Sequence, residues 1–326
     1  MRAAGNAQGM ILISEPLEPN VIETMRRSAL KLGFEVRYET RESAVAERIP
    51  ETEVFFGLYP ADIPIPGSLK WICLPSAGIN GYTDLPAIRD GRCLLTYSSG
   101  AYGITIGEHL VMLVLMLLRR MPEYLADARE GIWRHDRKLR SIYGSRIVIL
   151  GAGDIGSAFA ARARSFGPRS ITGISRSGRS SCDCYDRMLA VSELDRVLPE
   201  ADILVMALPE TPDTIHILNR QRIEKLPPQA LVVNVGRGSA IDEKALADAL
   251  RSRRIAGAAL DVFETEPLPA DDALRGIDSL IITPHMAGQR TLDESVRIIT
   301  EKFLDDLARY SRGERLLNLA DLARGY

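Results

Sequence analysis

The stretch "ILGAGDIG" (149–156) constrains the fold of this 326-residue chain more than any other. The apolar run "RIVIL" comes directly before its glycines and an alanine-rich helical pattern follows them, which is the context of a dinucleotide-binding strand–turn–helix. Such a turn normally lies near the start of the domain it serves, yet about 150 residues precede this one. We therefore expect two α/β domains, the second of which binds a dinucleotide.

Each residue of the turn has an expected role. Gly151 permits the sharp bend, Gly153 lets a pyrophosphate approach the backbone, and Gly156 lets the helix pack against the strand. The phosphates would then bind N–H groups at the helix N-terminus, around Asp154 and Ile155. The alternative is a strand–helix junction without a ligand, which the flanking pattern disfavours.

The segment before the turn alternates short apolar runs with helical patterns, which is typical of a parallel α/β sheet. We expect its strands at residues 10–14, 34–39, 53–58, 69–76 and 93–99, with a helix at 20–33. The pattern then repeats after a helix at 104–120 that is apolar almost all round. Further strands are expected at 146–151, 170–175, 201–209, 230–236, 255–263 and 279–285, with helices at 154–167 and 242–254.

One more long helix is expected at residues 292–313, after the second sheet is complete. The simplest arrangement returns this helix to the first domain, which then becomes discontinuous. We therefore expect one domain to consist of residues 1–100 and 288–326. Residues 101–287 would form the dinucleotide-binding domain, a doubly wound α/β fold of the Rossmann type.

The residues after the strand at 170–175 bear on the choice of cofactor. In NAD enzymes an acidic residue about 20 positions beyond the glycine turn binds the adenosine ribose. Here the sequence is "SRSGR", which has no carboxylate and offers Ser175, Arg176, Ser177 and Arg179. An arginine fork with flanking hydroxyls suits a 2′-phosphate, so we expect NADP(H) to be preferred, with NAD(H) possible. The alternative is an ordinary solvated basic loop.

Three residues suited to hydride chemistry follow three successive expected strands. Arg237 lies in "NVGRGSAID", Glu266 in "LDVFETEPLP" and His285 in "TPHMAG". Ligands of an open α/β sheet bind outside the carboxyl ends of its strands, so these side chains can meet at one crevice. His285 can supply the proton that ketone reduction requires near neutral pH. Glu266 would hold the imidazolium in place, and Arg237 would bind and polarise a carbonyl or carboxylate.

Composition narrows the functional classes. The net charge of −2, without a long basic block, argues against nucleic-acid binding. The most apolar stretch (110–118) is far shorter than a bilayer requires, and the first residues lack the apolar run of a secretory signal. The cysteines at 73, 93, 182 and 184 complete no zinc site. We expect a cytoplasmic protein with reduced thiols, no structural disulfide, no metal and no membrane partner.

Taken together, these motifs make the chain similar to the D-isomer-specific 2-hydroxyacid dehydrogenases, which include glyoxylate and hydroxypyruvate reductases. The resemblance covers nearly the whole chain and rests on "GAGDIG", "LPETPDT", "NVGRGSAID", "LDVFETEPLP" and "PHMAG". It implies a Rossmann domain inserted into a flavodoxin-like, doubly wound substrate domain. It also implies NAD(P)-dependent hydride transfer between a 2-keto acid and a D-2-hydroxy acid, with Arg237, Glu266 and His285 as catalytic triad and His285 as acid–base.

The resemblance also implies several lesser roles. The backbone amides of Ala77 and Gly78 would hold the substrate carboxylate. Cofactor contacts are implied for a set of residues on loops beyond the strands: Leu208, Pro209, Thr214, Val235, Gly236, Asp261 and His285. Within that set, Asp261 would bond the nicotinamide carboxamide. Members of the family are usually homodimers, joined through the Rossmann domain and the long helix that opens it.

The leading expectation is an NADPH-dependent reductase of glyoxylate, hydroxypyruvate or a larger 2-keto acid. A phosphoglycerate dehydrogenase-like enzyme is an alternative, less favoured because no long C-terminal regulatory domain follows. A formate dehydrogenase is disfavoured because that branch has glutamine where this chain has Glu266. A dinucleotide-sensing, co-repressor-like binding protein is the alternative from another class; such proteins retain the triad, but this chain has no extended tail.

Overall fold

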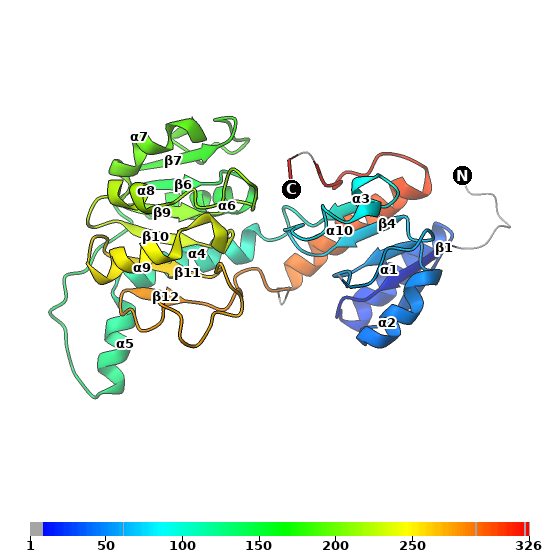
Figure 1. The fold of residues 1–326 in the computed structure, drawn as a ribbon, viewed down its shortest axis with the longest axis horizontal. Coiled ribbons are helices and arrows are strands. Elements are labelled where there is room, and N and C mark those ends of the chain that lie inside the picture. The colour runs from blue at the N-terminus through cyan, green and yellow to red at the C-terminus, as the bar shows by residue number, and fades with distance from the viewer. Residues whose placement is uncertain (1–8, 61, 291, 323, 326) are drawn as a thin grey trace. The chain divides into compact units, whose positions relative to one another are not determined.

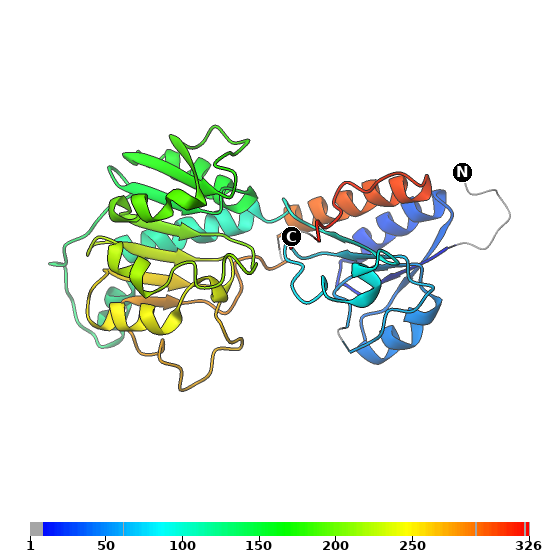
Figure 2. The ribbon, with the colours of Figure 1, turned by 45° about the horizontal axis from the view of Figure 1, so that its top comes forward.

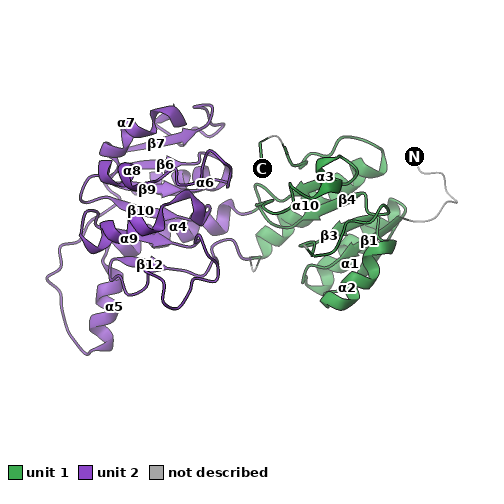
Figure 3. Cartoon of the chain, viewed as in Figure 1, with its two compact units in different colours: residues 1–101, 290–326 green, residues 102–289 purple. Residues whose placement is uncertain are grey.

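The structure is a computed structural model that describes residues 9–60, 62–290, 292–322 and 324–325. The expectation about a secretory signal falls largely on residues 1–8, which lie outside the described residues. The chain splits into two compact units, coloured separately in Figure 3: residues 1–101 with 290–326 form unit 1, and residues 102–289 form unit 2. The boundaries expected from the sequence lie one or two residues away from these.

Unit 1 contains a five-stranded parallel sheet in the order β2-β1-β3-β4-β5. Its strands are β1 (Gly9–Ile13), β2 (Phe34–Tyr38), β3 (Val54–Phe56), β4 (Trp71–Leu74) and β5 (Leu94–Tyr97). Its helices are α1 (Pro19–Lys31), α2 (Glu42–Arg48), α3 (Pro86–Arg89) and α10 (Asp293–Ser311). This strand order is that of the flavodoxin-like doubly wound fold, as the family resemblance implied.

The last long helix, α10, belongs to the core of unit 1 (Figure 1). The ring of Phe303 stacks on Trp71 with centroids 5.4 Å apart and meets the edge of Phe56 at 4.8 Å. The indole N–H of Trp71 donates to the hydroxyl of Thr96 at 2.8 Å, so its polar atom is satisfied inside the core. The unit is therefore built from both ends of the chain.

Unit 2 contains a seven-stranded parallel sheet in the order β12-β11-β10-β9-β6-β7-β8. Its strands are β6 (Arg146–Leu150), β7 (Ser170–Ser175), β8 (Arg187–Ala190), β9 (Ile203–Met206), β10 (Leu231–Asn234), β11 (Gly257–Leu260) and β12 (Leu280–Ile282). Its helices are α4 (Gly103–Leu118), α5 (Met121–Arg129), α6 (Asp154–Arg164), α7 (Leu194–Val197), α8 (Arg220–Lys225) and α9 (Glu243–Arg251). The order extends the Rossmann sheet by one strand and reverses between β6 and β9, where ligands of such sheets bind.

Helices cover both faces of this sheet (Figures 1 and 2). Helix α4 packs on α6 and on the strands β10 and β11, while α7, α8 and α9 lie on the opposite face. Both faces are thus covered, which explains why β9, β10 and β11 are buried along their whole length. Among the described helices, none combines the length and the apolar character needed to cross a membrane.

Besides the short helices α7 and α8, for which no residue range was expected, two elements of unit 2 differ from the sequence-based expectation. The expected strands did not include β8, a four-residue edge strand whose exposed Arg187 and lack of alternating pattern hide it. The expected helices did not include α5, which follows directly on α4 and projects from the body of the unit with the coil behind it (Figure 1). Neither difference affects the strands that carry the candidate site.

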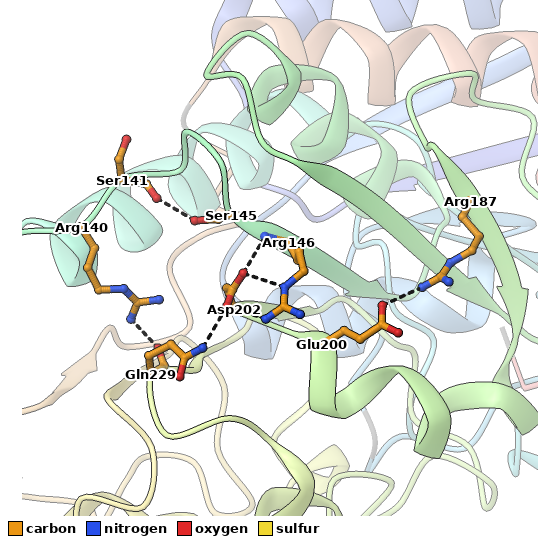
Figure 4. Close-up of polar contacts among 8 residues, drawn as sticks. All are labelled: Arg140, Ser141, Ser145, Arg146, Arg187, Glu200, Asp202 and Gln229. Atoms are coloured by element: carbon orange, nitrogen blue, oxygen red, sulfur yellow. Dashed lines mark hydrogen bonds and ion pairs between the residues drawn. The ribbon is translucent and has the colours of Figure 1, made fainter.

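Figure 4 shows a polar network at the amino ends of the strands, opposite the edge where ligands bind. Asp202, just before β9, accepts hydrogen bonds from the Arg146 backbone at 2.8 Å and from its guanidinium at 3.1 Å. The side-chain amide of Gln229, just before β10, also donates to Asp202, at 3.2 Å. Arg140 donates to the Gln229 backbone carbonyl. These bonds tie three adjacent strands together where they begin.

The cysteines give a correction. Cys73 and Cys93 are buried free thiols, but Cys182 and Cys184 form a disulfide, so the expectation of no structural disulfide was wrong. The irregular loop between β7 and β8 folds back here, so the two Cα atoms lie 5.3 Å apart and the Cys184 N–H reaches Cys182 Sγ at 3.2 Å. Their C-x-C spacing matches neither a zinc motif nor a C-x-x-C redox motif, so the sequence carried no signal for a bond within one loop.

Candidate active site

The glycine turn joins the buried strand β6 to α6. Gly151 has a φ of +105°, and a Cβ there would lie 2.5 Å from the carbonyl oxygen of Ala207. A Cβ at Gly156 would collide with the Gly151 carbonyl and lie 3.0 Å from Cγ2 of Ile149. A Cβ at Gly153 would meet nothing within 4 Å. The outer glycines are therefore tightly packed, while Gly153 faces open space.

The N-terminus of α6 stands beside that open space. The helix begins at Asp154, follows the N-cap residue Gly153, and has no side-chain cap. The first N–H groups of a helix lack intrahelical partners and carry partial positive charge. An uncapped helix end with room for a ligand at Gly153 fits the pyrophosphate of a dinucleotide.

The loop after β7 is a closed turn. The Ser175 hydroxyl donates to the Arg179 carbonyl at 2.9 Å and accepts from the Arg179 N–H at 3.0 Å. Gly178 has a φ of +69° and allows the chain to reverse. Ser175 therefore shapes the loop, while Arg176, Ser177 and Arg179 are exposed on it. Their exposure leaves cationic and hydroxyl groups accessible where the adenosine ribose of a Rossmann ligand lies.

A second loop, after β9, lies directly beside the glycine turn. Ala207 opens this loop and is the residue that a Cβ at Gly151 would strike. Leu208 and Pro209 follow and are half-buried. The Thr214 hydroxyl donates to the Pro209 carbonyl at 2.9 Å and accepts from the backbone N–H of Thr211 at 2.8 Å. Thr214 thus fixes the shape of the loop that would contact the cofactor.

The loop that carries Arg237 follows β10 and is closed by Asn234. The Asn234 side chain accepts from the N–H of Gly236 at 3.0 Å and donates to the carbonyl of Arg237 at 2.8 Å. Val235 and Gly236 are buried beneath this turn. Asn234 was not among the expected site residues, although an asparagine immediately before a glycine-flanked turn is a recognisable signal for such a side-chain-to-backbone closure.

Gly238 lets this loop pack against the loop after β11. A Cβ at Gly238 would overlap the backbone carbonyl carbon of Phe263. Burial lowers the pKa of the Arg237 guanidinium, an effect that the nearby carboxylates of Glu210 and Glu266 oppose. The Arg237 side chain therefore lies in a partly desolvated position close to Glu266, where its charge acts more strongly than in water.

His285 and Glu266 form a direct pair. Nδ1 of His285 lies 2.7 Å from Oε2 of Glu266, and the other carboxylate oxygen accepts from the N–H of Phe263 at 2.9 Å. Half of the His285 side chain is exposed, at 51%. One oxygen of Glu266 is thus anchored to backbone and the other to the ring, which directs Nε2 of His285 away from the carboxylate.

Asp261 braces the loop that carries His285. Its carboxylate is 1% exposed and accepts from the Thr283 hydroxyl at 2.6 Å and from the N–H groups of Met286 and Ala287 at 3.0 Å. Its carbonyl accepts from the His285 N–H at 2.8 Å. His285 has a φ of +49°, a strained conformation for a residue other than glycine, so these bonds hold it where it would not remain unaided.

The carboxylate of Asp261 is enclosed by donors of its own unit. The bond from Asp261 to the nicotinamide carboxamide, which the family resemblance implied, stays a prediction. His109 of α4, which was not among the expected site residues, adds to this cluster: Nε2 lies 3.3 Å from the Thr283 hydroxyl and 3.8 Å from Asp261. Burial lowers the pKa of His109, and Asp261 opposes that shift.

Ala77 and Gly78 lie in unit 1, in the irregular segment that follows β4. The Ser76 hydroxyl donates to the Gly78 carbonyl at 2.7 Å, and the Ser76 carbonyl accepts from the N–H of Ser98 at 2.9 Å. This segment is therefore held at the carboxyl edge of the first sheet. The triad residues, in contrast, all lie in unit 2.

Comparison with known proteins identifies the family of the chain. Residues 111–287 match the family model described as the D-isomer specific 2-hydroxyacid dehydrogenase, NAD binding domain. A glyoxylate reductase of Korarchaeum cryptofilum is 32% identical over 70% of this chain and 69% of its own length.

Solved structures agree over nearly the full length. A D-isomer specific 2-hydroxyacid dehydrogenase family protein of Aeromonas salmonicida is 30% identical, with a TM-score of 0.83 over 97% of this chain and 99% of its own. A D-isomer specific 2-hydroxyacid dehydrogenase of Xanthobacter autotrophicus, solved with NADPH and MES, is 28% identical, with a TM-score of 0.82 over 98% of this chain and 100% of its own. The chain therefore belongs to the D-isomer-specific 2-hydroxyacid dehydrogenase family and is an NAD(P)-dependent oxidoreductase.

Proposed function

We propose that this enzyme uses NADPH to reduce a small 2-keto acid, with glyoxylate and hydroxypyruvate as leading candidates, to the corresponding 2-hydroxy acid, which has the D configuration where the product is chiral. The observation that carries the proposal is the His285–Glu266 pair, which lies beyond β12 and β11, beside the Arg237 loop. The glyoxylate reductase relative supports the substrate class, and the relative solved with NADPH supports the cofactor.

His285 acts as the proton donor in this proposal. A reduced nicotinamide, when bound, would supply the hydride, and Nε2 of His285 would give a proton to the oxygen that becomes the hydroxyl. The carboxylate of Glu266 accepts a hydrogen bond from the Nδ1–H of His285, which fixes the ring orientation and stabilises the imidazolium. In the oxidative direction the same nitrogen removes the hydroxyl proton.

Arg237 binds the substrate and polarises its carbonyl. The Arg237 guanidinium remains protonated at neutral pH even though burial lowers its pKa. Two of its N–H groups can donate to two substrate oxygens at once. We assign the substrate carboxylate to the backbone amides of Ala77 and Gly78, as in the family pattern. Val235, Gly236, Leu208 and Pro209 are assigned to the cofactor side, on loops that pack against the glycine turn or its neighbour.

The preference for NADPH follows from the turn at 175–179. A 2′-phosphate carries about two negative charges, and the exposed Arg176 and Arg179 with the Ser177 hydroxyl supply complementary donors. The turn contains no carboxylate that would favour a free ribose hydroxyl. NADH is then a usable but weaker cofactor.

We also propose a homodimer formed through unit 2. Large apolar side chains are exposed on α4, on α5 and on the coil that follows, among them Met112, Leu125, Ile132 and Trp133, the last at 94% exposure. Such concentrated exposure is typical of an interface that a partner covers. Trp133→Asp should shift the sedimentation coefficient from dimer to monomer; an unchanged coefficient contradicts this proposal. We place the enzyme in the cytoplasm, a location that cell fractionation tests.

The experiment for the proposed activity follows NADPH and NADH oxidation spectroscopically with a panel of 2-keto acids. Turnover of glyoxylate or hydroxypyruvate with a lower KM for NADPH than for NADH supports the proposal. Binding of the dinucleotide without turnover of any 2-keto acid would instead favour a dinucleotide-sensing binding protein.

A further inference from the structure

The loop from Arg179 to Asp186 joins the proposed phosphate-binding turn to the edge strand β8, and it contains the Cys182–Cys184 disulfide. We propose that this pair is a thiol–disulfide exchange site whose redox state sets the affinity of the enzyme for NADP(H). The coupling rests on the proposed function, because it assumes that the adenosine phosphate binds at residues 175–179. Dithiols, small or carried by a protein, are the chemical class that the site would take.

A cross-link between residues two apart in sequence contributes little to global stability. The entropy that a disulfide removes from the unfolded chain grows with the length of the loop it closes, and here that loop is as short as two bonded cysteines with one residue between them. The bond must therefore act locally, on the loop itself. In intracellular proteins, disulfides are usually transient and serve catalysis or redox sensing.

The loop is attached to the glycine turn on one side of the disulfide. The Ser180 hydroxyl donates to the carbonyl of Ala152, the residue between Gly151 and Gly153, at 3.2 Å. The same hydroxyl accepts from the N–H of Cys182 at 3.2 Å. A chain of two hydrogen bonds thus connects the first cysteine to the turn that would carry the pyrophosphate.

On the other side, the loop is anchored to α6. The Cys184 Sγ lies 3.6 Å from the Ser157 carbonyl, and the Cys184 carbonyl accepts from the Arg164 guanidinium at 2.9 Å. The Tyr185 hydroxyl lies 3.3 Å from the Ser157 hydroxyl. The second cysteine is thus fixed to the helix whose N-terminus faces the ligand, and the disulfide links these two attachments.

The two cysteines differ in exposure. Cys184 is 8% exposed, whereas Cys182 is half-buried and lies between the exposed residues Ser181 and Asp183. A dithiol therefore attacks Sγ of Cys182: the Cys182–Cys184 bond breaks, a mixed disulfide forms on Cys182, and Cys184 leaves as a thiolate that takes up a proton. The second thiol of the dithiol then releases Cys182. The protein disulfide gains two electrons and two protons, and the dithiol is oxidised to its own disulfide.

Reduction removes the cross-link that holds the backbone bend at residues 182–184, so the segments attached to the glycine turn and to α6 can change their relative orientation. The oxidised loop is pre-organised for the cofactor, and the reduced loop must be ordered when the cofactor binds, so affinity falls on reduction. We expect the Kd for NADPH to rise about 3- to 30-fold, which corresponds to the ordering of a few side chains. The Kd of the nicotinamide half alone, probed with nicotinamide mononucleotide, should not change.

The test uses the full chain equilibrated with reduced or oxidised dithiothreitol. Alkylation followed by peptide mass spectrometry counts the thiols at 182 and 184, and fluorescence titration measures the Kd for NADPH in each state. The double variant C182S/C184S should bind NADPH like the reduced enzyme under both conditions, and Cys93→Ser, at a buried thiol outside the loop, should retain the redox response.

Two alkylated cysteines after reduction together with a weaker Kd for NADPH support the proposal. Absence of thiols after reduction overturns the exchange site, and an equal Kd in two states that alkylation proves distinct overturns the coupling. Both readouts use the wild-type chain and do not depend on the variants folding. If neither state binds NADPH, the proposed cofactor is wrong and the coupling falls with it, while the thiol counts still decide the exchange site.

Discussion

Nδ1 of His285 lies 2.7 Å from Oε2 of Glu266, and the second oxygen of that carboxylate is held by the N–H of Phe263. The ring is thereby oriented by a group that is itself fixed to the backbone. In the proposed reaction, that orientation aims Nε2 at the substrate oxygen, and the proton transfer depends on it. The same unit contains a second pair, His216–Glu264, at 2.8 Å.

The two pairs provide a matched test of His285. Both histidines have a left-handed backbone, with φ of +49° at His285 and +48° at His216, and asparagine tolerates that conformation. His285→Asn should lower kcat for 2-keto acid reduction about 100- to 10,000-fold, because the proton donor is lost. His216→Asn should leave kcat within a few-fold. Steady-state kinetics of both variants decide the point, and equal losses would show that His285 has no special role.

Asp261 is predicted to act as a positioning residue. Asp261→Asn places an amide donor against the N–H of Met286 or Ala287, so the His285 loop should shift. We expect the free energy of unfolding to fall by about 1–3 kcal/mol and kcat to fall about 10- to 100-fold, with a displaced pH profile.

The control for this variant is Asp202→Asn at the opposite edge of the sheet (Figure 4). Burial alone would raise the pKa of Asp202, but hydrogen bonds from Arg146 and Gln229 lower it overall. The stability that the Asp202 carboxylate contributes is therefore present above pH 3.8 and is lost as the pH falls below that value.

At neutral pH the Asp202→Asn variant should be less stable than the wild type but should retain the wild-type dependence of kcat on pH. An equal shift of the pH–kcat profile in Asp261→Asn and Asp202→Asn would show that Asp261 affects only stability and does not position His285.

Arg176 is predicted to recognise the 2′-phosphate. Arg176→Ala should raise the Kd for NADPH about 10- to 100-fold, because hydrogen bonds to a charged group are lost. The Kd for NADH should stay nearly unchanged. Arg169, exposed at the amino end of the same strand β7, provides the matched control. Arg169→Ala should affect neither cofactor. Parallel losses for NADPH and NADH in Arg176→Ala would mean that the arginine does not recognise the phosphate.

Glu243 gives a prediction about pH. Burial raises its pKa from 4.5 to about 7, the carboxylates of Glu264, Asp272 and Glu266 add to the shift, and the N–H of Glu264 opposes it. The folded state therefore favours the protonated form: the benefit is complete below pH 4.5 and is lost as the pH rises through 7. Above that pH the buried charge costs stability.

Glu243→Gln removes this charge and retains an acceptor for the Glu264 N–H. The variant should gain on the order of 1–3 kcal/mol over the wild type as the pH rises from about 4.5 to 7, and the difference should then level off. Thermal unfolding across that range measures it. A difference that does not vary with pH would contradict the raised pKa.

Most of the fold could be predicted because its signals are local. Apolar runs marked eleven of the twelve strands in the part of the chain that the structure describes, and the glycine turn lies near the start of the inserted domain. Close packing around Gly151 and Gly156 explains why a larger residue would not fit there, while the pyrophosphate contact at Gly153 stays a prediction. Edge strand β8 was missed because it is short and carries no alternating pattern.

The contacts within the site were harder to predict because they join residues far apart in sequence. The triad was chosen from three strand ends, but the role of His109 depends on Thr283, a partner 174 residues away that no local pattern indicates. The disulfide was missed because the backbone bend that joins Cys182 to Cys184 depends on contacts with α6 and the glycine turn. Local sequence patterns therefore predicted the strands and the domain organisation, whereas the side-chain contacts of the site depend on tertiary structure.

The most direct test of the proposed reaction is the stereochemistry of the product. Purified enzyme is incubated with NADPH and with glyoxylate, hydroxypyruvate or pyruvate, and NADPH oxidation is followed spectroscopically. The chiral hydroxy acids formed from hydroxypyruvate and from pyruvate are then separated into their D- and L-isomers by chiral chromatography. We predict one mole of hydroxy acid per mole of NADPH oxidised, with only the D-isomer formed from hydroxypyruvate and pyruvate; His285→Asn should abolish this turnover and His216→Asn should preserve it. Formation of the L-isomer, or binding of NADPH with no hydroxy acid from any 2-keto acid, would contradict the proposed reaction.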